Sequence, residues 1–178
     1  QQKTDAGLKE LARLPNLKTL QVSDTRVTDS GLDDVARMAS LQSLYLGYTG
    51  VTDAGLKKLA GMKLDSLVIP TRAWTDQGGA DYLRARRSPP SSVSLYYTTV
   101  TDEGLAELAR VADLEQLVLT WSDITDEGIK HLAGMKNLRS LHLDFSGITA
   151  EGMRVVGELK SLEYLSFPFH ATDVALSR

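Results

Sequence analysis

The sequence contains no cysteine, which excludes disulfide bonds and zinc sites built from thiolates. No apolar run approaches the roughly 20 residues of a membrane-spanning helix, and no signal peptide is visible. A strong excess of one charge is also missing. The net charge of -3 is spread over both signs, so neither nucleic acid nor an anionic membrane is indicated as a partner. With 42% hydrophobic residues, the composition is that of an ordinary folded, soluble protein.

A short motif recurs along the chain at a nearly fixed interval. Thr-Asp-x-Gly stands, complete or in weaker form, at Thr4, Thr28, Thr52, Thr75, Thr101, Thr125, Thr149 and Thr172. The steps between these threonines are 24, 24, 23, 26, 24, 24 and 23 residues, and such a period indicates a stacked repeat architecture. We therefore expect residues 1–178 to form one domain of about seven repeats of about 24 residues, each burying its apolar face against its neighbours.

Each repeat changes its hydrophobic period at this motif. Leu44 and Leu46 alternate as in a strand, whereas Leu56 and Leu59 recur on one face of a helix. Threonine is a good helix N-cap, and aspartate in the first turn complements the helix dipole, so the motif predicts a helix start. A threonine or serine at the ninth position, such as Thr49, is expected to bond backbone groups where the chain leaves the strand. Stacked in parallel, such units predict an α/β fold with an inner sheet of about seven strands and helices outside.

The consensus L-x-x-L-x-L-x-x-T-x-V-T-D-x-G-L-x-x-L-A resembles the leucine-rich repeat family over nearly the whole chain. Its second half is similar to the cysteine-containing subclass of F-box adaptors and bacterial repeat arrays. That subclass has cysteine or asparagine at the ninth position, which is occupied here by Thr25, Thr49, Arg72, Thr98, Ser122 and Ser146. The resemblance implies a right-handed, horseshoe-shaped solenoid with helices on its convex side and a concave face that binds another protein.

The fourth unit, residues 75–100, departs most from the consensus. Gly79 stands where a leucine is expected, and Pro89 and Pro90 must end the helix before the next strand. A basic run lies between them: Arg84, Arg86 and Arg87. Two interpretations stay open for this run, a tolerated insertion in an exposed loop or a contact for an anion or acidic partner.

Both ends of the repeat array look incomplete. The first unit lacks its strand and the last stops at "TDVALSR", and neither shows a polar cap of the kind that solenoids need. We therefore expect that the array is truncated at both ends, and that the chain is a monomer or associates end to end through its uncapped termini.

Aromatic residues are few, yet they gather at one position of the repeat. Of the eleven in the chain, five stand at the position just before the ninth. The complete column reads Asp24, Tyr48, Thr71, Tyr97, Trp121, Phe145 and Phe169. Neighbouring strands lie about 4.8 Å apart, so these rings are expected to form a ladder along one edge of the sheet. The ladder is either packing between repeats or an exposed stripe that binds a partner.

The outward strand positions are small, polar and nearly uncharged, unlike the basic stripe of a nucleic-acid binder. We expect partner contacts on this concave face at Tyr45, Tyr96, His142 and Tyr164, next to the aromatic edge.

A catalytic site is conceivable at His142, which shares a strand face with Ser140 and Asp144. Alternate residues of an ideal strand are about 6.6 Å apart, too far for short side chains to bond directly. No glycine elbow or oxyanion loop accompanies them. A metal site at His142 and Asp144 would lack an evident third ligand. We therefore expect no enzyme, no metal and no cofactor.

The prediction is a non-enzymatic module that binds another protein through the concave face and its aromatic edge. Two alternatives remain. One is a structural spacer within a larger protein, without a specific ligand. The other is a carbohydrate binder or hydrolase that uses the aromatic edge.

Overall fold

The structure is a computed structural model, and it describes residues 4–166. The chain divides into two compact units, Gln1–Ser88 and Pro89–Arg178, which are described separately. The division falls inside residues 75–100, the unit predicted to be irregular. Phe169 and the predicted last helix start lie outside the described residues.

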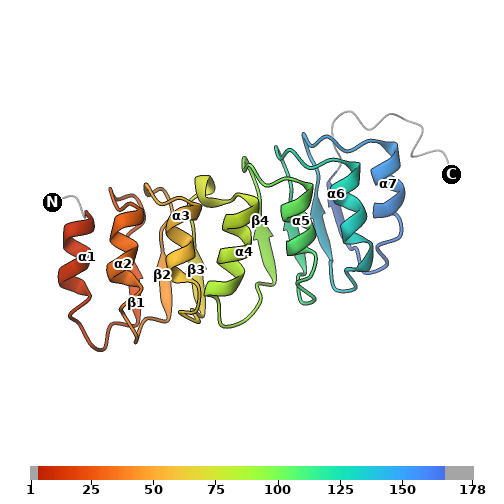
Figure 1. Cartoon of the computed structure of the whole chain (residues 1–178). Coiled ribbons are helices and arrows are strands. Elements are labelled where there is room, and N and C mark those ends of the chain that lie inside the picture. Colours follow the sequence, from red (N-terminus) through yellow and green to blue (C-terminus); the bar gives the residue numbers. More distant parts are fainter. Residues whose placement is uncertain (1–3, 167–178) are drawn as a thin grey trace. The chain divides into compact units, whose positions relative to one another are not determined.

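The first unit contains three parallel strands in the order β1-β2-β3, with helical segments packed along one side (Figure 1). The strands are β1 (Thr19–Gln21), β2 (Ser43–Tyr45) and β3 (Ser66–Val68). The helical segments are α1 (Asp5–Leu11), η1 (Asp29–Gly31), α2 (Leu32–Val35), α3 (Asp53–Leu56), η2 (Lys57–Leu59), η3 (Thr71–Ala73) and α4 (Asp76–Ala85). The register places Leu20, Leu44 and Leu67 side by side, and all three are buried.

The second unit repeats this plan with four parallel strands in the order β4-β5-β6-β7. The strands are β4 (Ser92–Ser94), β5 (Gln116–Val118), β6 (Ser140–His142) and β7 (Tyr164–Ser166). The helical segments are α5 (Asp102–Leu108), α6 (Asp126–Lys130), η4 (His131–Gly134) and α7 (Ala150–Val156). The seven predicted strands are thus present, and their hydrogen bonds divide them into sheets of three and four.

Burial follows the two periods read from the sequence. In β5 the central Leu117 is fully buried while Gln116 and Val118 on either side of it are only half-buried. The apolar face of the preceding helix, with Leu105 and Leu108 in α5, closes the core from the other side. The open face of each sheet, opposite the helices, is therefore free for side chains that do not serve the core.

The hydroxyl at the ninth position bonds within its own repeat. Five such side chains donate to the backbone carbonyl three residues earlier, at 2.6–3.0 Å: Thr25, Thr49, Thr98, Ser122 and Ser146. The predicted backbone role is confirmed.

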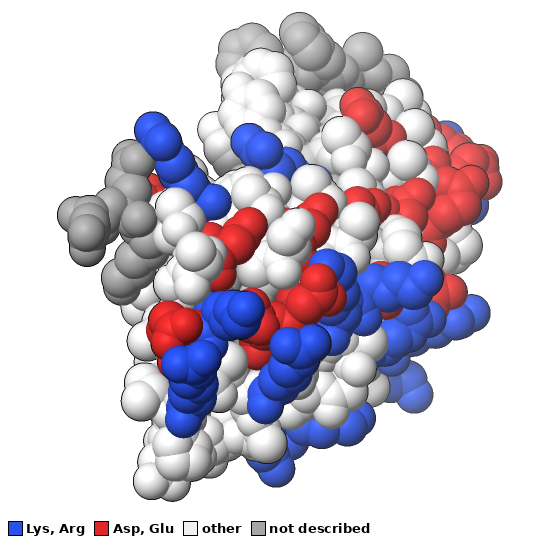
Figure 2. All heavy atoms as spheres, turned by 60° about the vertical axis from the view of Figure 1, so that its left-hand side comes forward, with Lys and Arg blue, Asp and Glu red and all other residues white. Residues whose placement is uncertain are grey.

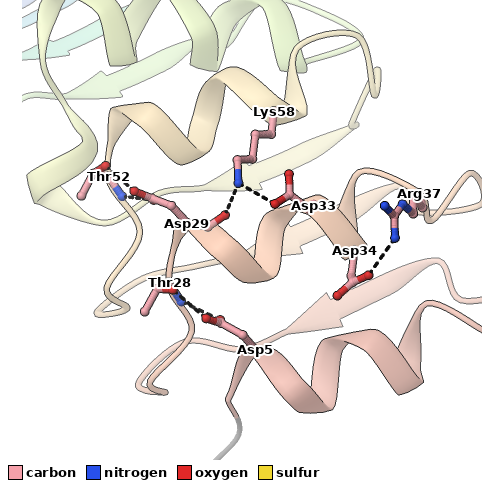
Figure 3. A network of polar contacts seen from close by, with 8 residues as sticks. All are labelled: Asp5, Thr28, Asp29, Asp33, Asp34, Arg37, Thr52 and Lys58. Atoms are coloured by element: carbon pink, nitrogen blue, oxygen red, sulfur yellow. Dashed lines mark hydrogen bonds and ion pairs between the residues drawn. The ribbon is translucent and has the colours of Figure 1, made fainter.

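The Thr-Asp part of the motif joins each repeat to the next. The Asp29 carboxylate accepts two bonds from Thr52, one from the backbone N–H and one from the hydroxyl, both at 2.7 Å (Figure 3). The same pair of bonds recurs at Asp5 with Thr28, Asp102 with Thr125, and Asp126 with Thr149. The predicted N-cap role is the lesser one, because the described threonine caps accept a cap bond only at Thr75, Thr125 and Thr149.

The glycine of the motif leaves room for this carboxylate. A Cβ atom on Gly55 would lie 2.3 Å from Asp29 Oδ1, and one on Gly128 would lie 2.2 Å from Asp102 Oδ1. Both separations are far below van der Waals contact. Thr, Asp and Gly therefore form one clamp between consecutive repeats.

In the fourth unit, an aromatic ring packs at Gly79, the position where a leucine was expected. Gly79 faces the Trp74 indole, which is 9% exposed and lies 4.8 Å from the Tyr82 ring. Burial raises the pKa of the Tyr82 phenol, while the nearby Arg86 guanidinium acts in the opposite direction.

The basic run of this unit is paired within the first unit. Arg84 donates to the buried Asp81 carboxylate at 2.9 Å, and Arg87 donates to Asp65 Oδ1 at 2.6 Å. Arg86 donates to the Asp65 carbonyl at 3.2 Å and lies over the Tyr82 ring. These contacts favour the structural interpretation of the run over an anion site.

Candidate functional site

Three aromatic rings of the second unit stack face to face. We call Tyr97, Trp121 and Phe145 the aromatic ladder. Tyr97 and Trp121 have ring centroids 5.4 Å apart and planes 8° apart, and Trp121 and Phe145 have 4.3 Å and 11°. The parallel register of β4, β5 and β6 brings the three rings together, since each follows its strand by the same number of residues.

The ladder stands on a left-handed backbone. The φ angles are 52° at Tyr97, 57° at Trp121 and 53° at Phe145, and the equivalent Tyr48 has 54°. Asp24, at this position in an earlier repeat, also has a positive φ, which aspartate tolerates well. A bulky ring in this region is strained, at a cost of about 1–2 kcal/mol per residue. The Trp121 backbone N–H donates to the Asp144 carbonyl of the next rung at 3.2 Å, which helps to hold this conformation.

The rings are stacked and exposed at once. Tyr97 is 56% exposed, Trp121 43% and Phe145 48%. Stacking therefore leaves a large part of each ring accessible to solvent. The three rings therefore pack between repeats and also form an exposed stripe, so the two interpretations are compatible.

Other predicted contact residues lie on or beside the open sheet faces. Tyr96 is exposed and meets Tyr97 edge to face, with centroids 4.5 Å apart. In the first unit, Tyr48 is 84% exposed, and Tyr45 is half-buried with its hydroxyl 3.5 Å from Ser66 Oγ.

His142 and Tyr164 form a second ring contact in the second unit, with centroids 4.8 Å apart. Ser140 Oγ lies 3.2 Å from His142 Nε2, so the separation predicted from an ideal strand was wrong for this pair. The imidazole is long enough to fold back along its own strand. Ser166 donates a short hydrogen bond to the Asp144 carboxylate, and among residues 4–166 no carboxylate bonds to His142. A serine next to a histidine without an orienting acid does not make a catalytic triad.

The described part of the chain offers neither a metal cluster nor a membrane span. Within residues 4–166, no group of three or more His, Asp or Glu side chains could hold a metal ion. No helix there is long and apolar enough to cross a membrane.

Charges gather on the helical side. Acidic and basic side chains mostly form two adjoining bands on the face drawn in Figure 2. Their separation follows the helix dipole, with Asp29 and Asp53 in first turns and Lys57 and Lys58 in a last turn. On this face the described residues thus carry an acidic band and a basic band side by side.

Sequence comparison matches the description "Leucine Rich repeat" to residues 13–36, 37–60, 112–133 and 134–157, together more than half of the chain. The chain belongs to the leucine-rich repeat family. The predicted α/β leucine-rich repeat fold is thereby confirmed. Among solved structures, the chain is similar to an internalin, InlF, from Listeria monocytogenes, with 20% identity and a TM-score of 0.39. The match covers 89% of this chain and 37% of the internalin chain. No curated protein matches the sequence.

Proposed function

We propose that this leucine-rich repeat protein is a non-enzymatic interaction module that binds another protein. The binding surface comprises the aromatic ladder and the open sheet face beside it, including Tyr96, His142 and Tyr164. One observation carries the proposal: bulky rings occupy a strained left-handed position in successive repeats and remain about half exposed.

The strain separates this column from ordinary packing. At a left-handed position, glycine, asparagine or aspartate fits at little cost, as Asp24 illustrates. Stacking contributes about 0.5–1.5 kcal/mol for each ring pair. That gain does not require edges that face the solvent. Exposed tyrosine and tryptophan rings are the side chains that most often anchor protein interfaces.

The stacked geometry disfavours the carbohydrate alternative. A sugar stacks on the face of an aromatic ring, and Trp121 is already stacked with two neighbouring rings, Tyr97 and Phe145. Ring edges suit the aliphatic side chains and backbone carbonyls of a polypeptide, because an aromatic edge carries partial positive charge. Within residues 4–166 no acid orients His142, which disfavours the hydrolase alternative. The spacer alternative gives no reason for strained, exposed rings.

The test compares ladder variants in a pull-down from extract of the source organism. Trp121→Asn removes the central ring and keeps a residue that suits a positive φ, while His131→Ala on the exposed helical side serves as the control. Any protein retained by wild type and His131→Ala, and lost with Trp121→Asn, is purified and its binding measured by calorimetry. We expect at least tenfold weaker binding for Trp121→Asn, in the range of interface hot spots.

Two results would overturn the proposal. One is a set of retained proteins that is the same for all three forms. The other is a purified partner whose affinity is unchanged by Trp121→Asn although thermal unfolding shows that the variant is folded.

A further inference from the structure

We infer that the partner presents an extended polypeptide segment rich in lysine or arginine, which lies along the aromatic ladder and pairs with the carboxylates beside it. This inference rests on the proposed function and adds the chemistry of the partner. What carries it is a row of exposed rings whose neighbours in the chain include Asp123 and Asp144, the latter accepting a hydrogen bond from Ser166, with no lysine or arginine in the same rungs.

The charge of the second unit is one-sided. Its described residues, 89–166, carry twelve Asp and Glu against six Lys and Arg, a net charge of -6. In the first unit, residues 4–88 carry ten acidic and twelve basic residues, a net charge of +2. The small net charge of the whole chain conceals this difference. The acidic unit is also the one that carries the ladder.

The rungs that display the ladder are acidic without compensation. Each rung runs from the start of a strand to just past its ring: residues 92–100, 116–124 and 140–148. These contain Asp123 and Asp144 but no lysine or arginine. Neither carboxylate forms an ion pair within the described part of the chain, whereas Glu107, Glu127, Glu151 and Glu163 elsewhere in this unit do.

The two carboxylates lie close to the rings along the chain. Asp123 is exposed and follows Trp121 by two residues. Asp144 directly precedes Phe145, and its carbonyl accepts the Trp121 backbone N–H. A lysine or arginine side chain has an apolar stem and a charged end, so its stem fits against ring edges while its end reaches a carboxylate. A single lysine or arginine side chain can therefore contact the rings and a carboxylate together.

The rungs in the first unit provide an internal contrast. Residues 43–51 hold Tyr48, the most exposed ring among residues 4–166, but no charged side chain, whereas residues 19–27 hold Asp24 with Arg26 and residues 66–74 hold Arg72. Tyr48 therefore offers the same backbone position without the acidic surroundings, and it serves as the matched control.

The experiment selects ligands without assuming a sequence. A phage library of random twelve-residue peptides is panned on the immobilised protein at low ionic strength, and the composition of retained peptides is compared with the starting library. The most enriched peptide is then synthesised with a fluorescent label. Its affinity is measured by anisotropy for wild type, Trp121→Asn, Tyr48→Asn and the double variant Asp123→Asn/Asp144→Asn.

We expect retained peptides to be enriched in lysine and arginine. The double variant should bind the selected peptide about 2- to 30-fold more weakly, the range for two exposed ion pairs. That loss should shrink as salt rises, because the screening length falls from about 30 Å at 0.01 M to about 8 Å at 0.15 M. Tyr48→Asn should bind as wild type does.

Enrichment of neutral or acidic peptides, or no enrichment, would overturn the inference. Unchanged affinity of the double variant would do so as well. If peptide affinity depends on Trp121 but not on the two carboxylates, the inference of a basic partner is wrong, while the proposal that the ladder binds a partner stands. A partner from the pull-down that depends on Trp121 and contacts the ladder with a neutral segment leads to the same conclusion. Self-association in sedimentation that is lost with Trp121→Asn would assign the ladder to a second copy of the chain instead.

Discussion

Replacing Asp29 with alanine should loosen two neighbouring repeats more than the removal of any exposed carboxylate nearby. Its two oxygens accept the backbone N–H and the hydroxyl of Thr52, both at 2.7 Å and partly buried. A hydrogen bond to a charged group contributes about 1.5–3 kcal/mol. Partial exposure favours the lower end of that range, so two such bonds give an expected loss of about 3 kcal/mol for Asp29→Ala.

Two further substitutions separate the bonds from the charge. In Asp29→Asn the amide oxygen still accepts the Thr52 N–H and the amide nitrogen donates to the hydroxyl. Two neutral bonds of about 1 kcal/mol each then remain, so the expected loss is about 1 kcal/mol. Thr52→Val removes only the hydroxyl bond, with an expected loss of about 1.5 kcal/mol.

Asp33 is the matched control for this clamp. Asp33 lies four residues after Asp29; its side chain is 58% exposed and pairs at 2.8 Å with Lys58 of the next repeat (Figure 3). An exposed ion pair contributes about 0.2–1 kcal/mol, so Asp33→Ala should change stability little. Urea unfolding followed by circular dichroism measures all four variants, with the free energies compared at equal slope. The clamp would be refuted if Asp29→Ala lost no more stability than Asp33→Ala.

Four further substitutions test the glycine of the clamp and the irregular fourth unit. Gly128→Ala should lower the free energy of unfolding by about 2 kcal/mol, because its Cβ would meet Asp102 Oδ1 at 2.2 Å. Gly134→Ala, with no atom within 4 Å of its Cβ, should not lower it; equal losses in urea unfolding would contradict this reason. Trp74→Ala should cost about 3–5 kcal/mol in the same assay, since the indole is nearly buried where the repeat lacks its leucine; a loss below about 1 kcal/mol would mean that the site collapses. Absorbance titration should show Tyr82 losing its proton above the ordinary value near 10, because burial raises its pKa, and Tyr82→Phe should remove that contribution to the titration curve. Since the folded state holds the proton more tightly, stability should fall as pH rises above about 10, and less so in Tyr82→Phe; an equal fall in both would contradict the sign.

The sequence was sufficient for the repeat plan because that plan depends on periodicity. Leu117 and Leu105 are buried where the two hydrophobic periods place them, and the ninth-position hydroxyl of Thr49 bonds the backbone as expected. The role of the motif aspartate was missed, since its partner lies one repeat away. A local reading of Thr52 and Asp53 suggests a cap and a dipole contact, and only the stacking brings Asp29 to Thr52.

For the candidate site, too, some features could be predicted from the sequence and others could not. The column of aromatic residues was visible in the sequence because the repeat aligns it. Its left-handed backbone was not, since sequence statistics put glycine or asparagine at such positions rather than tryptophan. The Ser140–His142 contact was also missed, because strand spacing says nothing of how a long side chain lies along its own strand.

The geometry of the ladder supports the binding role proposed for its strained rings. A side chain that is mobile before binding loses about 0.5–1.5 kcal/mol of entropy when an interface fixes it. Trp121 is already fixed, between Tyr97 on one face and Phe145 on the other, and its backbone is tied to the next rung. The cost of the left-handed conformation belongs to folding and is met before any partner arrives. A partner that meets the exposed ring edges therefore binds a surface that needs little further ordering.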